Sequence, residues 1–159
     1  MDLSLRAGRV DDLPRVAEVM IAARRAAHPA MPPFVHADEE VRRWVAGWSL
    51  GAADLWVAEL GQAVVGFALA TPTWLDHLYV DPRHAGTGVG SALLTLVQAV
   101  RPAGVGLWVF ESNLPARRFY ARHGFAEIRR TDGRDNEEGE PDIEMRWRPG
   151  AAPGSAGSA

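Results

Sequence analysis

The chain has 159 residues, of which 47% are hydrophobic and 23% charged, values typical of one soluble globular domain with its own core. It contains no cysteine, which excludes disulfide scaffolds, thiolate metal sites and cysteine nucleophiles. The formal net charge of −3 argues against a broad nucleic-acid-binding surface.

The sequence carries no signal for export, membrane insertion or metal binding, so we expect a cytoplasmic protein. No apolar run approaches the roughly 20 residues that span a bilayer, and the first residues lack the basic-then-apolar order of a signal peptide. The five histidines show neither HxxxH nor HxH spacing, so no metal is expected. From 149 onward the chain contains only Gly, Ala, Pro and Ser, which predicts one domain at 1–148 and a disordered tail at 149–159.

The first part of the chain predicts a strand and two helices. Leu3–Arg6 alternates like a short strand. Asp11 or Asp12 is typical of a helix N-cap, and an apolar face at helical spacing follows it. Three prolines between 29 and 33 end this helix, and the acidic run Asp38–Glu40 predicts the start of the next one.

The middle of the chain predicts a hairpin followed by a central strand. Residues 55–59 and 64–70 are short β-rich runs joined by a Gly-Gln turn. Residues 74–80 are apolar on both faces except at Asp76 and His77, which is typical of a strand inside a sheet.

The remaining segments complete an alternating pattern. An amphipathic helix is expected at 89–100, a buried strand at 105–110, a helix capped by Asn113 up to His123, and a strand pair at 125–129 and 143–147. The order β-α-α-β-β-β-α-β-α-β-β predicts an α/β fold, with a mixed sheet and helices on both faces.

The segment DPRHAGTGVGS, residues 81–91, joins the central strand to the amphipathic helix. Its glycines at 86, 88 and 90 leave space for a ligand to approach the backbone. Amides at a helix N-terminus carry about half a positive charge, so the loop suits a pyrophosphate. The chain has no lysine, which excludes a Walker A loop, and GxGxG spacing differs from the dinucleotide pattern GxGxxG. The alternative is a tight turn whose glycines serve only packing.

A second segment, ESNLPARRFYARHGF at 111–125, strengthens the phosphate interpretation. Together the two segments resemble the GNAT acetyltransferase superfamily. Residues 78–82 are similar to its fourth strand and 86–91 to its acyl-CoA loop. The series Asn113, Ala116, Phe119-Tyr120 and Gly124-Phe125 is similar to its next motif. The predicted element order fits the family from residue 3 to 147.

The resemblance implies a mixed, mostly antiparallel central sheet and direct transfer of an acetyl group from acetyl-CoA to a primary amine, through a tetrahedral intermediate. It also implies a set of cofactor-binding positions: Leu78, Tyr79, Val80, Ala85, Gly86, Thr87, Gly88, Val89, Gly90, Ser91, Asn113, Ala116, Arg117, Phe119 and Tyr120. The family usually carries Gln or Arg where this chain has Ala85. An RxxGxG pattern also runs from Arg83 to Gly88, but the glycine register favours Ala85. We therefore expect the loop to bind mainly through backbone amides.

The resemblance implies a general acid on the helix after Asn113, and Tyr120 is the candidate. Its phenol, with a reference pKa of about 10, can donate a proton at neutral pH. A core tyrosine with a satisfied hydroxyl is the alternative. Glu111 and Asp76 are equal candidates for the general base, with His77 behind them, and a water path is also open.

The family's acceptor site implies two loops in this chain, residues 28–36 and 132–142. The second holds six acidic residues and would attract a cationic amine of a small molecule or peptide, unless it is a solvated hairpin loop. Two other functions stay open at this point: an acyl-CoA sensor without turnover, and another type of nucleotide-binding α/β protein. A homodimer is possible, and neither nucleic acid nor membrane is expected as a partner.

Overall fold

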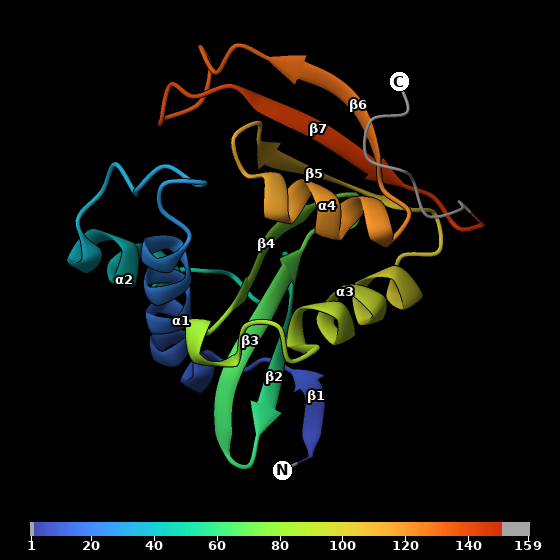
Figure 1. Ribbon diagram of the computed structural model, residues 1–159. Helices are drawn as coiled ribbons and strands as arrows, with labels where there is room; N and C mark the ends of the chain where they lie inside the picture. The colour runs from blue at the N-terminus through green and yellow to red at the C-terminus, as the bar shows by residue number, and fades with distance from the viewer. Residues whose placement is uncertain (1, 151–159) are drawn as a thin grey trace.

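The computed structural model describes residues 2–150, so residues 151–159 of the tail predicted at 149–159 lie outside them. The elements follow the predicted order, with two short 3-10 turns added (Figure 1): β1 (Leu3–Ala7), η1 (Val10–Asp12), α1 (Leu13–Ala26), α2 (Asp38–Ala46), β2 (Asp54–Leu60), β3 (Ala63–Ala70), β4 (Leu75–Val80), η2 (Pro82–His84), α3 (Val89–Val100), β5 (Val105–Phe110), α4 (Leu114–Arg122), β6 (Ala126–Thr131) and β7 (Asp142–Trp147).

The strands form two antiparallel groups, ordered β1-β2-β3-β4 and β5-β7-β6. A parallel bridge between Trp74, just before β4, and Gly106 of β5 connects the two groups. The predicted fold, a mixed and mostly antiparallel sheet with helices on both faces, is confirmed. The chain therefore builds a sheet that is continuous at one end of the β4–β5 pair and interrupted along the rest of it.

β3 lies at the centre of the first group, and every residue in it after Ala63 is buried. One apolar cluster joins this sheet to α1 and α2, and a second joins it to α3 on the other face. Gly66 allows the close approach of α3, because a Cβ there would lie 3.0 Å from Val89 and 3.2 Å from Leu93. This packing fixes the N-terminus of α3 beside the end of β4.

Candidate functional site

β4 and β5 part just beyond their bridge. The amide of Gly106 donates a hydrogen bond of 3.0 Å to the carbonyl of Thr73, and the Trp74 ring covers Gly106 so closely that an added Cβ would lie 2.6 Å from it. Further along, β4 pairs with β3 and β5 pairs with β7, and the two strands diverge (Figure 1). A cavity of about 240 Å³ opens between them. We call it the central cavity.

The free edge of β4 faces the central cavity. The amide of Asp81 donates to the Val65 carbonyl at 2.8 Å, so this residue points its N–H toward β3. Because backbone groups alternate between the two edges of a strand, Leu78 and Val80 direct their N–H and C=O groups away from β3. Both residues, with Tyr79, line the cavity. The edge can therefore hydrogen-bond an amide-containing arm.

A β-bulge places Asp76 at the rim of this cavity. On β3, the adjacent residues Leu69 and Ala70 pair with His77 and Leu75, which leaves Asp76 as the extra residue. Asp76 lines the central cavity and remains open to solvent at its rim. Partial burial nevertheless raises the pKa of its carboxyl. A carboxylate with a raised pKa is a better proton acceptor near neutral pH.

α4 supplies the wall opposite this strand edge. Asn113, Ala116 and Tyr120 all line the central cavity. Asn113 is the N-cap of α4, because its Oδ1 accepts a 3.3 Å hydrogen bond from the Ala116 amide. Burial, with a smaller effect of Tyr79, raises the pKa of Tyr120. The Tyr120 hydroxyl therefore stays protonated at neutral pH, as a proton donor requires.

The glycine loop, residues 85–91, lies next to both β4 and α4. Gly86 and Gly88 have φ angles of 75° and 90°, and a Cβ on either would meet no atom within 4 Å. A Cβ on Gly90 would lie 3.6 Å from Val80 and from Phe119, so the loop borders the end of β4 and α4. Open left-handed glycines before a helix N-terminus fit the pyrophosphate of CoA.

Several side chains in or just before this loop pack against or bind other residues of the protein. Val89 is buried against the core, and the Thr87 hydroxyl donates to the His84 carbonyl at 2.5 Å. Arg83 binds Asp81 at 2.9 Å, and Arg15 binds the same carboxylate at 2.8 Å. These contacts support binding of a phosphate through the loop backbone.

Beyond the residues of the loop at 85–91 and Phe119, two further predicted site residues, Glu111 and Arg117, do not line the central cavity. The Glu111 carboxylate binds Arg130 at 2.9 Å, which lowers the pKa of Glu111. Arg117 binds Glu127 at 2.8 Å and the Glu111 carbonyl at 2.9 Å. Neither residue lines the cavity. Of the two acidic candidates, Asp76 therefore lines the central cavity and Glu111 does not, and Arg117 braces the β5–α4 corner.

His77 lies between the central cavity and a second one. Its ring stacks on Trp48 at 5.3 Å and meets Trp44 edge-on at 5.4 Å. Burial, together with the charge of Arg24, lowers the pKa of His77 to about 4. A neutral imidazole that binds a proton so weakly is a poor base for an amine. The helical spacing of the two tryptophans indicated one apolar face but not this contact with the strand.

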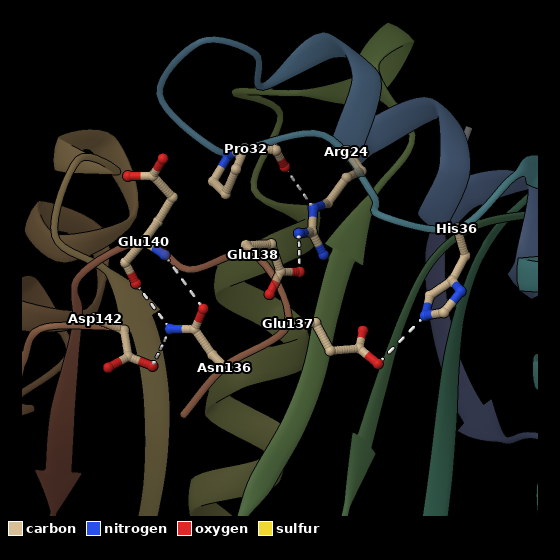
Figure 2. Close-up of polar contacts among 8 residues, drawn as sticks. All are labelled: Arg24, Pro32, His36, Asn136, Glu137, Glu138, Glu140 and Asp142. Atoms are coloured by element: carbon tan, nitrogen blue, oxygen red, sulfur yellow. Dashed lines mark hydrogen bonds and ion pairs between the residues drawn. The ribbon is translucent and has the colours of Figure 1, made fainter. Parts of the chain in front are cut away.

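The second cavity, about 670 Å³, lies where the two predicted acceptor loops meet. Its lining comes from α1, α2, β4 and both loops: Arg24, Phe34, His36, Glu40, Val41, Arg43, Trp44, His77, Glu137 and Glu138. Figure 2 shows two ion pairs made by the second loop: Glu138 with Arg24 of α1 at 2.8 Å, and Glu137 with His36 of the first loop at 3.2 Å. We call this space the acceptor-side cavity.

The acidic loop, residues 132–142, is held in a defined conformation by its own hydrogen bonds. The Asn136 amide donates to the Glu140 carbonyl at 2.7 Å and to Asp142 at 3.3 Å (Figure 2). Thr131 also hydrogen-bonds Asp142. These contacts turn Glu137 and Glu138 toward the loop after α1.

Within residues 2–150, the structure shows no cluster of three or more His, Asp or Glu side chains able to hold a metal. None of the helices in that range is long and apolar enough to cross a membrane.

Comparison with known proteins gives consistent matches. The family model for the acetyltransferase (GNAT) domain matches residues 51–127. The peptidyl-lysine N-acetyltransferase YjaB of Salmonella typhimurium is 37% identical over 84 residues, which cover 52% of this chain and 57% of YjaB. The solution structure of apo YjaB from Escherichia coli superposes with a TM-score of 0.75 at 26% identity, over 92% of this chain and 98% of that one.

A more distant structure shares the fold. The PaiA N-acetyltransferase of Thermoplasma acidophilum, solved with coenzyme A, has a TM-score of 0.70 at 16% identity. The match covers 93% of this chain and 99% of that one.

Proposed function

Because this chain is an acetyltransferase of the GNAT superfamily, we propose that it transfers the acetyl group of acetyl-CoA to a primary amine entering from the acceptor-side cavity. The observation that carries this proposal is the opening between β4 and β5. Its lining combines a free strand edge with a carboxyl group at Asp76 and a phenol at Tyr120.

The residues that would hold acetyl-CoA lie along one path. The backbone amides of residues 86–90 bind the pyrophosphate, since the open glycines and the start of α3 favour an anion there. Leu78 and Val80 hydrogen-bond the pantetheine arm, and Asn113 and Ala116 border it. Ala85 contributes no polar side chain to this path. Acetyl-CoA supplies the thioester whose acetyl group becomes bonded to the amine nitrogen.

Two side chains move the protons. Asp76 accepts a proton from the acceptor ammonium, directly or through one water, because its raised pKa suits a base. Tyr120 donates a proton to the departing sulfur, and the raised pKa of its phenol keeps that proton in place beforehand. The second proton that the amine nitrogen loses as the amide forms returns Tyr120 to its phenol form. The N–H of Leu78 faces the cavity nearer Asp76 and stabilises negative charge on the acetyl oxygen, which leaves the N–H of Val80 for the pantetheine arm.

The proposed acceptor is a lysine side chain on a peptide. The relative YjaB is named for peptidyl-lysine acetylation. The acceptor-side cavity of this chain is bordered by Glu137, Glu138 and the half-exposed ring of Trp44. Glu138 and Glu137 pair with Arg24 and His36, and their remaining lone pairs can accept hydrogen bonds from an ammonium group, whereas an indole can cover its aliphatic stem.

A CoA-release assay tests the proposal. Acetyl-CoA would be offered with a lysine peptide whose N-terminus is blocked, with a peptide carrying a free N-terminus, and with polyamines and aminoglycosides. The proposal predicts CoA release with the lysine peptide. Thermal stabilisation by CoA without release for any amine would instead indicate a sensor. Stabilisation by ATP or NAD but not by CoA would contradict acyl-CoA binding.

A further inference from the structure

Arg24 is a buried arginine on α1 at the border of the acceptor-side cavity. Only 8% of its side chain is exposed, and its ion-pair partner Glu138 is 14% exposed. The Arg24 Nε also donates to the Pro32 carbonyl at 3.0 Å (Figure 2). One guanidinium therefore binds the loop after α1 and the β6–β7 loop at once.

Two aromatic rings hold the same guanidinium. Its carbon lies 4.3 Å from the centroid of Phe34 and 5.5 Å from that of Phe110. Phe34 belongs to the wall of the acceptor-side cavity, whereas Phe110 lines the central cavity at the end of β5. Arg24 thus contacts elements of both cavities, and its planar fork suits this combination of stacking and directed hydrogen bonds.

Stability alone is a weak reason for this arrangement. Removing two charges from water is costly, and buried ion pairs can often be replaced by apolar residues without loss of stability. The charge of Arg24 also affects His77: together with burial, which is the larger cause, it lowers the pKa of His77 and keeps the imidazole neutral. His77 lines both cavities.

We propose that Arg24 is a positioning residue that holds both loops of the acceptor-side cavity in place relative to the central cavity, and so sets the affinity for the acceptor amine. This inference rests on the proposed function of the acceptor-side cavity. It assigns Arg24 no contact with the reacting atoms.

The neighbouring arginine offers a matched control. Arg25 is on the same helix but is 69% exposed, and its ion pair with Asp38, at 2.7 Å, lies outside both cavities. The substitution Arg25→Gln removes the same charge from the same turn without touching either loop of the acceptor-side cavity.

The experiment measures the KM of the blocked lysine peptide, the Kd of CoA and the titration of His77 by NMR. Arg24→Gln is expected to raise the peptide KM about tenfold, equivalent to roughly 1.4 kcal/mol, while the CoA Kd stays within about twofold. Arg24→Lys keeps the charge but loses the planar fork, so a smaller rise of about threefold is expected. The pKa of His77 should rise in Arg24→Gln and stay unchanged in Arg25→Gln.

Each outcome separates the two proposals. If the wild-type protein binds CoA but acetylates no amine, the proposed function fails, and the role of Arg24 fails with it. If the wild type is active and Arg24→Gln leaves the peptide KM unchanged, or weakens CoA equally, only the role of Arg24 is overturned. If Arg24→Gln does not fold, Arg24→Lys decides the question: a peptide KM equal to that of the wild type overturns the role.

Discussion

Asp76 and Tyr120 line one cavity from two different elements, β4 and α4, and burial raises the pKa of both side chains. The raised pKa makes the Asp76 carboxylate a better proton acceptor. The raised pKa of Tyr120 keeps its phenol protonated, so that it has a proton to donate. A single environment therefore favours both the base and the acid of the proposed acetyl transfer.

Replacing Tyr120 with Phe should reduce kcat about a hundredfold, the usual loss on removing a general acid. The Kd of acetyl-CoA should stay within about twofold, because the Phe ring keeps the packing against Phe119 and Phe125. Steady-state kinetics and calorimetry measure the two effects. An unchanged kcat would remove Tyr120 from the mechanism.

Replacing Asp76 with Asn should remove the acid limb of the pH–rate profile. The carboxyl must be ionised to accept a proton, so the wild-type rate should fall at low pH with a midpoint above the ordinary aspartate pKa of about 3.9. Glu111→Gln is the control, since Glu111 is paired with Arg130 away from the cavity. A limb that disappears in Glu111→Gln but persists in Asp76→Asn would reverse the assignment.

Replacing Gly88 with Ala should weaken acetyl-CoA binding about tenfold, because a left-handed alanine costs roughly 1–2 kcal/mol and its methyl group enters the proposed phosphate space. Gly61→Ala imposes a similar backbone cost at φ 64° in the β2–β3 turn and should leave the CoA Kd unchanged. Arg83→Gln should have little effect on this Kd, since Asp81 holds Arg83. A larger loss in Arg83→Gln than in Gly88→Ala would show side-chain binding.

Replacing Asp81 with Asn should flatten the acid side of the stability curve. Hydrogen bonds from Arg83 first, and also from Arg15, hold the pKa of Asp81 well below its usual value. A lowered carboxyl pKa stabilises the folded state above the unfolded-state pKa of about 3.9 and loses that contribution as pH falls further. The Tm measured from pH 6 to about pH 2 should decline less steeply in the variant. Parallel declines would contradict this role.

His36 should titrate above its ordinary pKa of about 6.5. The bond to Glu137 is the main cause of this rise, and Glu40 adds to it. A raised histidine pKa means that this contact stabilises the folded protein fully below the unfolded-state pKa of about 6.5. Its contribution is lost as the pH rises through the higher folded-state pKa. NMR titration of His36 in the wild type and in Glu137→Gln measures this. An equal pKa in both would show that the contact is absent in solution.

The sequence was most informative where function depends on neighbouring residues. The glycine loop and the segment from Asn113 to Tyr120 are continuous in the chain, so residue type and spacing reveal their helix starts and their open backbone. The two cavities depend on distant contacts instead. Arg24 and Glu138 are 114 positions apart, and no periodic pattern pairs them.

The different placement of Asp76 and Glu111 depends on contacts that residue type does not reveal. Asp76 lines the cavity because β3 pairs with β4 around a bulge, which requires the register of both strands. Glu111 forms an ion pair with Arg130 on β6 instead. Both are acidic residues on or beside buried strands, and only the three-dimensional partners distinguish them.

Acetyl transfer to lysine can be measured by incubating the wild-type protein and Tyr120→Phe with acetyl-CoA and the blocked lysine peptide, following free CoA and the peptide mass together. The wild type is expected to add one acetyl group to the lysine for each CoA released, and Tyr120→Phe is expected to bind CoA but to acetylate far more slowly. CoA binding by both proteins, with no acetylated product from either, would contradict the proposed acetyl transfer.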